Sequence, residues 1–209
     1  MAEAFRQRVR LRFAKTGDAR FLSHHDLMRA WEMALRRSGL PLRLTEGFNP
    51  RIRLSMPLAL SLGIASQDEI LEIELDGWTP AEGIRDRLAP ELSPGLALKD
   101  LELLAPGKKG QVAWVEYSAR IPDADGERLK ALLEKPQVIV ERRREESRKD
   151  LDIRPFLLEV RREAEEDWRM RLKITPQGTA RPDEALRAAG LDGPQVPGLL
   201  TKTRTEMEG

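Results

Sequence analysis

The chain has 209 residues, of which 36 are Lys or Arg, 35 are Asp or Glu, and none is Cys. Without cysteine it cannot form a disulfide, a cysteine-ligated zinc site, a thiolate nucleophile or the usual kind of iron–sulfur cluster. Its 40% hydrophobic content suffices for one large or two small folded domains. We expect a cytoplasmic protein, because the opening residues lack a signal-peptide core and no apolar stretch approaches the ~20 residues of a membrane span.

The net charge of +1 hides a strong asymmetry along the chain. Residues 1–56 carry 12 Lys or Arg and 5 Asp or Glu, whereas residues 57–107 carry 3 and 10. Segregation of this kind indicates either a face that binds a polyanion or a charged surface that is only solvated. Charge alone leaves both interpretations open.

Hydrophobic periodicity predicts the order β-α-β, loop, β-α-β in the first half of the chain. The first strand alternates Val9, Leu11 and Phe13 with Arg8, Arg10 and Arg12, which is typical of a half-buried strand. Ser23, with Asp26 three places later, is expected to cap a helix that ends at Gly39. The other expected elements are strands over 41–45, 69–75 and 96–104, and a helix over 80–89 capped by Thr79.

The same order of elements recurs after residues 106–110, which have the composition of a linker. The expected elements are strands over 112–121, 138–140, 168–174 and 199–206, and helices over 124–134 and 182–189. We therefore predict an α+β fold of tandem ferredoxin-like (βαββαβ) halves with antiparallel sheets, residues 1–105 and 111–209. The alternative is one mixed α+β domain without duplication.

The arginines of the first strand are candidates for binding nucleic acid. A βαββαβ sheet covered by helices on one face leaves the other face open, and such faces often bind RNA. Arg8, Arg10 and Arg12 would lie about 6–7 Å apart on this open face, where they could hold phosphates. The alternative is that Glu72 and Glu74 of the later acidic strand neutralise them through cross-strand ion pairs.

The segment from Glu46 to Met56 combines a turn-rich loop with two arginines. In an RNA-binding interpretation, Phe48 stacks on a base while Arg51 and Arg53 hold the neighbouring phosphates. In the other interpretation, Phe48 fills the core beneath the loop. The downstream insert, residues 142–155, supplies the further candidates Arg148, Lys149 and Arg154, although ion pairs with its own acids are an alternative there.

The sequence predicts no metal site and no cofactor. Asp150 and Asp152 alone provide too few ligands for a metal ion, and phosphate-binding loops and nucleophile-elbow motifs are missing from the sequence. The only histidines, His24 and His25, are adjacent on an expected helix, which makes shared metal ligation awkward. Either one could act as a general acid or base in RNA cleavage, or contact a phosphate.

Several phrases of the sequence resemble a bacterial family of unassigned function. They are Arg10-Leu-Arg-Phe-Ala-Lys15, Phe21-Leu-Ser-His-His-Asp-Leu-Met-Arg29, Glu46-Gly-Phe-Asn-Pro50 with Leu54-Ser55, and Asp152-Ile-Arg-Pro155. Members of this family are found beside, or fused to the C-terminus of, radical S-adenosylmethionine (radical SAM) proteins. The resemblance implies a partnership with a radical SAM enzyme that acts on RNA, and it supplies no catalytic residues.

The leading hypothesis is a non-catalytic module that binds RNA or presents a substrate to a radical SAM enzyme. The absence of cysteine agrees with this division of labour, because the enzyme would carry the iron–sulfur cluster. Two alternatives stay open: a metal-independent RNA-processing nuclease that uses His24 or His25, and a protein-only adaptor that docks the enzyme through the acidic stretch 68–102.

Overall fold

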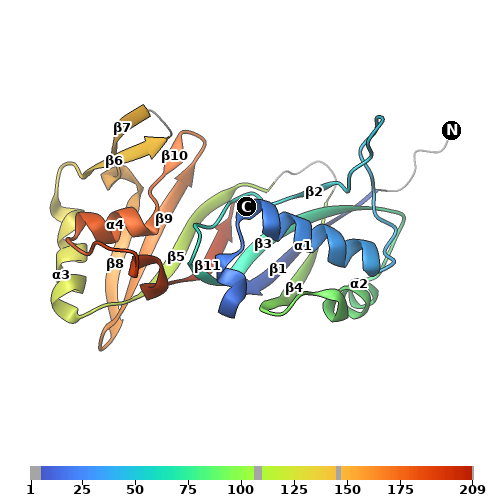
Figure 1. Ribbon diagram of the computed structural model, residues 1–209, viewed down its shortest axis with the longest axis horizontal. Coiled ribbons are helices and arrows are strands. Elements are labelled where there is room, and N and C mark those ends of the chain that lie inside the picture. Colours follow the sequence, from blue (N-terminus) through green and yellow to red (C-terminus); the bar gives the residue numbers. More distant parts are fainter. Residues whose placement is uncertain (1–5, 106–109, 145–146, 209) are drawn as a thin grey trace. The chain divides into compact units, whose positions relative to one another are not determined.

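The computed structural model describes residues 6–105, 110–144 and 147–208. These residues form two compact units, Met1–Gln111 and Val112–Gly209. The described part of the chain is a mixed α+β structure with four α-helices and mostly antiparallel strands (Figure 1). The expected linker, residues 106–110, lies outside the described residues except for Gly110. Within the described ranges, no helix has both the length and the apolar character needed to cross a membrane.

The first unit is built around β1 (Arg6–Lys15), the strand predicted from alternating valine, leucine and phenylalanine. It pairs antiparallel with β3 (Ala65–Asp76) and β4 (Leu96–Leu104), and β2 (Leu54–Ser55) pairs with β3. The order within this unit is therefore β4-β1-β3-β2. Its α-helices are α1 (His24–Arg37) and α2 (Ala81–Leu88). It also contains two short 3₁₀ helices, η1 (Gly17–Phe21) and η2 (Ala89–Glu91).

Apolar side chains of β1, β3, α1 and α2 form the core of the first unit. Val9, Leu11 and Phe13 are completely buried, and the Phe13 ring meets the ring of Trp31 edge-on with 4.7 Å between centroids. Successive strand residues point to opposite faces, so the arginines between these residues lie on the sheet face away from the core. The period-two pattern thus predicted correctly which β1 residues face the core and which lie on the opposite face of the sheet.

A capping residue was predicted for two of the helices, and one of these two predictions is wrong. Ser23 caps α1 as expected, because its hydroxyl accepts a hydrogen bond from the Asp26 backbone N–H at 3.2 Å. Thr79 does not cap α2, since Pro80 occupies the cap position. The Thr79 N–H instead donates to Oε1 of the buried Gln7 at 2.8 Å, which ties the start of α2 to β1.

The predicted strand over 41–45 is wrong. This segment makes only isolated bridges, between Leu42 and Leu75 and between Leu44 and Ile52. The reason is that the chain leaves the edge of β3 after Arg43, whose N–H donates to the Glu74 carbonyl at 2.9 Å, and then pairs with its own returning segment. A local hairpin takes the place of a regular strand.

The second unit is built around β5 (Val112–Arg120), which pairs antiparallel with β9 (Asp167–Thr175) and β11 (Leu200–Met207). Strand β8 (Leu157–Ala164) pairs with the other edge of β9, so the order within this unit is β11-β5-β9-β8. The remaining elements are α3 (Asp123–Ala131), α4 (Pro182–Ala188), β10 (Gly178–Thr179), η3 (Leu132–Glu134), η4 (Arg154–Phe156) and η5 (Val196–Leu199).

The second strand of this unit was predicted at the wrong place. Residues 138–140 lead into β6 (Ile139–Arg144), which pairs with β7 (Ser147–Asp152) in a separate two-stranded sheet. The edge position of the main sheet belongs instead to β8, which the sequence analysis missed. Four of its eight residues are Glu or Arg, and such a strand has only one weakly apolar face to signal it.

Gly126 in α3 is required by close packing against Trp168. A Cβ atom at this position would lie 1.9 Å from Cε2 of the buried Trp168 side chain. Gly83 in α2 is a helical glycine with space, because the nearest atom to its Cβ would be Cγ of Pro80 at 3.5 Å. The two helical glycines can therefore be compared by the same substitution to alanine, because only Gly126 lacks space for a methyl group.

We expect Gly126→Ala to lower the free energy of unfolding by roughly 1–3 kcal/mol through overpacking. Gly83→Ala should be neutral or stabilise by up to about 1 kcal/mol, because alanine favours the helix. Urea denaturation followed by circular dichroism measures both. Equal stability of the two variants would contradict the close contact between α3 and Trp168.

Candidate nucleic-acid interface

The arginines of β1 are paired with carboxylates of β3 and β4. Glu72 accepts hydrogen bonds from Arg8 Nη2 at 3.0 Å and from Arg10 Nη2 at 2.8 Å. Arg10 also reaches Glu102 at 3.1 Å, and Arg12 reaches Asp68 at 2.7 Å. The cross-strand pairing left open by the sequence is therefore present through Glu72, whereas Glu102 and Asp68 rather than the expected Glu74 supply the other carboxylates.

This pairing changes what the β1 row can offer a phosphate. Only 8% of Arg10 is exposed, and its guanidinium is shared between two carboxylates. A phosphate that bound Arg10 would take one of the two arginine partners from Glu72 and leave it with Arg8 alone, which is costly for a largely buried carboxylate. Phosphate binding by Arg8, Arg10 and Arg12 stays a prediction, and the structure gives these arginines a structural role.

Residues 42–54, which we call the 42–54 hairpin, carry the Gly-Phe-Asn-Pro motif. The Thr45 N–H donates to the Arg51 carbonyl at 2.7 Å, and the Arg53 N–H donates to the Arg43 carbonyl at 2.9 Å. Gly47 has a φ of +125°, a conformation that favours glycine. Figure 1 shows the segment between α1 and β2 as a narrow projection.

Phe48 is fully exposed in this hairpin, with a relative exposure of 105%. The interpretation that Phe48 fills the core is therefore wrong. Arg51 is also exposed, and its backbone N–H donates to the Thr45 hydroxyl at 3.0 Å. The turn thus holds an aromatic ring and a guanidinium in water within four residues of each other.

A pocket of about 370 Å³ adjoins the hairpin within the first unit. It brings together two predicted site residues from distant parts of the sequence, Arg8 of β1 and Arg53 of the hairpin. The complete lining is Arg8, Thr45, Ile52, Arg53, Leu54, Ser55, Glu72, Ile73 and Glu74. The volume suits a small ligand or a single nucleotide.

His24 and His25 lie exposed in the first turn of α1, with their ring centroids 6.0 Å apart. Among the described residues, neither imidazole has a hydrogen-bond partner that would fix its orientation. A catalytic histidine normally has such a partner. Catalysis by either histidine stays a prediction without support from the local geometry.

The three downstream candidates differ in their surroundings. Arg148 and Lys149 of β7 are exposed, and Arg148 forms a long ion pair with Glu141 at 3.7 Å. Arg154 is a structural residue: its guanidinium donates to the Leu133 carbonyl at 2.7 and 3.0 Å and to the Leu157 carbonyl at 3.1 Å. Arg148 and Lys149 of β7 are therefore the two candidates of this insert that are available to a partner.

Asp152, the first residue of the Asp-Ile-Arg-Pro phrase, also has a structural role. Its Oδ1 accepts hydrogen bonds from the Val138 N–H at 2.8 Å and the Arg154 N–H at 3.0 Å. The intervening Ile153 is completely buried. The phrase therefore fixes the corner between β7 and β8 rather than forming a ligand site.

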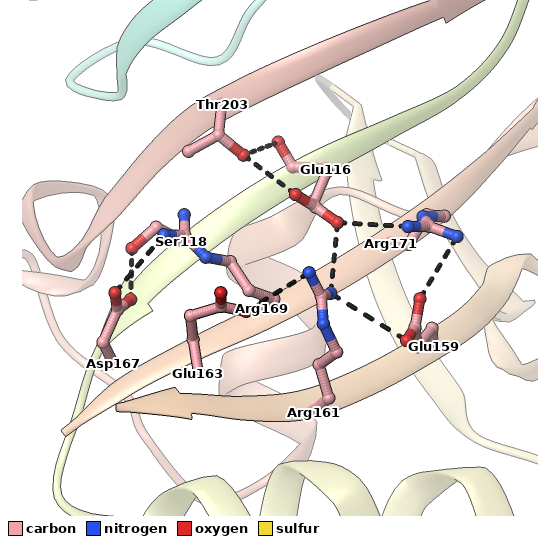
Figure 2. A network of polar contacts seen from close by, with 9 residues as sticks. All are labelled: Glu116, Ser118, Glu159, Arg161, Glu163, Asp167, Arg169, Arg171 and Thr203. Atoms are coloured by element: carbon pink, nitrogen blue, oxygen red, sulfur yellow. Dashed lines mark hydrogen bonds and ion pairs between the residues drawn. The ribbon is translucent and has the colours of Figure 1, made fainter. Parts of the chain in front are cut away.

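A charged network on the sheet of the second unit was missed by the sequence analysis (Figure 2). Glu116 of β5 lies at its centre and accepts hydrogen bonds from Arg161 at 3.2 Å and Arg171 at 3.3 Å. Arg171 also stacks over Trp114, with its guanidinium carbon 4.3 Å from the ring centroid. The alternating phrase Arg-Met-Arg-Leu-Lys over 169–173, which repeats the pattern of β1, was the available signal.

Glu116 is held in its charged form by this network. Burial disfavours the charge, but the hydrogen bonds and positive charges of Arg161 and Arg171 outweigh it and lower the pKa of Glu116 from its ordinary value of 4.5. The same contacts raise the pKa of Arg161 against the opposing effect of burial. The ion pairs therefore stabilise the folded state above the ordinary pKa of glutamate and lose that contribution as the pH falls through the lowered pKa.

We expect Glu116→Gln to destabilise the second unit by roughly 1–3 kcal/mol at pH 7, because two arginines lose a largely buried acceptor. Glu159→Gln is the matched control: Glu159 joins the same network but is more exposed, so less than about 1 kcal/mol is expected. Amide hydrogen exchange over β5 and β9 measures the effect. The difference between Glu116→Gln and the unmodified protein should shrink below pH 4.5, and a difference independent of pH would contradict the assignment.

Comparison with known proteins identifies the family but no function. No curated protein matches the sequence. A family model described as an uncharacterized protein conserved in bacteria (DUF2344) matches residues 8–182, which include the β1 arginines, the 42–54 hairpin and the Asp-Ile-Arg-Pro corner. That description names no radical SAM partner, so the partnership implied by the resemblance stays a prediction. The chain belongs to this uncharacterized bacterial family, DUF2344.

Proposed function

We propose that the protein is a non-catalytic RNA-binding module that captures single-stranded RNA with its 42–54 hairpin. Phe48 stacks on a base and Arg51 holds the adjoining phosphate, while Arg53 lies in the lining of the pocket beside the hairpin. The observation that carries the proposal is the fully exposed Phe48 ring beside the exposed Arg51 on a projecting turn. The known single-strand binders combine these two features, an aromatic platform and nearby cations.

The cost of exposing Phe48 supports a binding role. Burying a phenylalanine side chain is worth about 1.5–3 kcal/mol, and the turn forgoes that stabilisation. A base stacked on the ring recovers a similar amount, about 1–3 kcal/mol. In this proposal the paired β1 arginines support the sheet beneath the hairpin, and the exposed Arg148 and Lys149 add a second, weaker cationic contact.

We propose further that each unit is a ferredoxin-like half. The support is the shared order of elements: β4-β1-β3-β2 in the first unit corresponds to β11-β5-β9-β8 in the second. Each central strand comes first in its unit and is flanked by antiparallel neighbours. The separate β6–β7 hairpin is then an insertion between the first helix and the second main-sheet strand of the second half.

A partnership with a radical SAM enzyme is the remaining part of the proposal, and it rests on the resemblance of the sequence phrases. The protein would present RNA, and the enzyme would supply the reaction. Co-purification of the two proteins after nuclease treatment tests direct association. A complex that disappears with the RNA would show that the RNA alone connects them.

We expect Phe48→Ala to weaken binding of an unstructured RNA about 5- to 150-fold, the equivalent of one lost stacking contact. Phe21→Ala is the matched control, because Phe21 is also an exposed phenylalanine near an arginine, with Arg20 4.6 Å from its ring centroid. Filter binding at low and physiological salt measures the affinities. Equal losses in the two variants, or no binding at low salt, would contradict the proposal.

The salt dependence of the RNA affinity provides a separate test of whether Arg51 contacts a phosphate. Each phosphate contact on a single strand contributes a slope of about −0.7 in log affinity against log salt concentration. Arg51→Ala should therefore weaken binding and make the slope shallower by roughly this amount, whereas Phe48→Ala should leave the slope unchanged. A slope unaffected by Arg51→Ala would remove Arg51 from the phosphate contacts.

A further inference from the structure

We propose that the pocket beside the 42–54 hairpin binds one unpaired guanine base of the RNA, with Glu74 and Arg53 reading its edge. This inference rests on the proposed RNA-binding function and names the base that the same site selects. The hairpin supplies the pocket residues Thr45, Ile52, Arg53 and Leu54. An RNA strand that is bound at the turn by Phe48 and Arg51 therefore lies against the same hairpin that forms one side of the pocket.

The charge of the lining argues against a bare anion as the ligand. Arg8 and Arg53 contribute two positive charges, and Glu72 and Glu74 contribute two negative charges. A phosphate would meet as many carboxylates as guanidinium groups. A neutral molecule that carries both donors and acceptors fits this lining better, and a nucleobase is such a molecule.

The four charged side chains divide into an engaged pair and an available pair. Glu72 accepts three hydrogen bonds, one from Arg8 and two from Arg10. The nearest cations to Glu74 are Arg43 Nε at 3.6 Å and Arg53 Nη1 at 3.9 Å, both longer than a hydrogen bond. Arg43 is held by Asp76 at 2.9 Å, which leaves Glu74 and Arg53 to meet a ligand.

A carboxylate beside a guanidinium matches guanine better than the other bases. Guanine presents two parallel donors, N1–H and the N2 amino group, which the two oxygens of a carboxylate can accept together. Its O6 and N7 atoms accept the paired donors of an arginine, the commonest specific arginine–base contact. Adenine, cytosine and uracil lack the parallel donor pair, so each leaves part of the Glu74 carboxylate unsatisfied.

The pocket also has walls suited to a flat ring. Ile52, Leu54 and Ile73 provide apolar atoms, and the hydroxyls of Thr45 and Ser55 provide further polar contacts. The volume of about 370 Å³ accommodates a purine nucleoside but not several nucleotides. One base, extruded from a single strand, is therefore the ligand of matching size.

The test compares three labelled pentanucleotides, UUGUU, UUAUU and UUIUU, by fluorescence anisotropy. Inosine keeps O6, N7 and N1–H of guanine and lacks only the N2 amino group. We expect UUGUU to bind the unmodified protein about tenfold more tightly than UUAUU, with UUIUU between them. Glu74→Gln should abolish the preference for guanine over inosine.

Glu102→Gln is the matched control, because Glu102 is a carboxylate of the same sheet that pairs with Arg10 and lies outside the pocket lining. It should keep the full preference for guanine. Thermal denaturation checks that both variants fold, and the guanine–inosine comparison on the unmodified protein stands even if Glu74→Gln does not fold.

The outcomes separate this inference from the proposed function. Equal binding of the three pentanucleotides overturns the guanine pocket and leaves RNA binding intact. Absence of binding by all of them at low salt overturns the proposed function, and titration with guanosine and adenosine 5′-monophosphates then tests the pocket by itself. Equal or absent binding of these two nucleotides overturns the pocket as well.

Discussion

Ion pairs between arginine and glutamate hold the polar face of the sheet in each unit. Glu72 lies between Arg8 and Arg10, and Glu116 lies between Arg161 and Arg171. Neighbouring arginines on a strand would otherwise repel one another, and removal of one partner from such a pair leaves an uncompensated charge that is costly to bury. The carboxylates thus let each sheet carry a dense row of arginines opposite its apolar core, and they engage those arginines within the protein.

This constraint decides where a polyanion can bind. The sequence suggested the β1 arginines, together with Arg51 and Arg53, as the cations, and the structure joins the β1 arginines to Glu72, Glu102 and Asp68. The exposed Arg51 and Phe48 lie instead on the 42–54 hairpin, which projects from the sheet edge. In our proposal the hairpin captures RNA and the adjoining pocket, where Arg53 Nη1 lies 3.9 Å from Glu74 Oε2, selects the base.

Local patterns predicted the strands and helices whose periodicity is strong. They failed where the state of a residue depends on a partner far along the chain. The alternation in β1 and the Ser23 cap are local, so they were predicted correctly. The choice between free and paired arginines depends on the register of β1 against β3, which no local pattern contains. The same holds for Phe48, because an aromatic ring in a loop is buried or exposed according to the direction of the whole hairpin, and for β8, whose charged residues conceal its single apolar face.

The central claim, that the 42–54 hairpin contacts RNA, is tested most directly by photo-crosslinking. RNA containing 4-thiouridine is irradiated with the intact protein, and the crosslinked tryptic peptides are identified by mass spectrometry. Cleavage after Arg43 and Arg51 releases residues 44–51 as one peptide that contains Phe48. If the hairpin binds RNA, the main crosslink lies in this peptide. Crosslinks confined to peptides from other parts of the chain would contradict it.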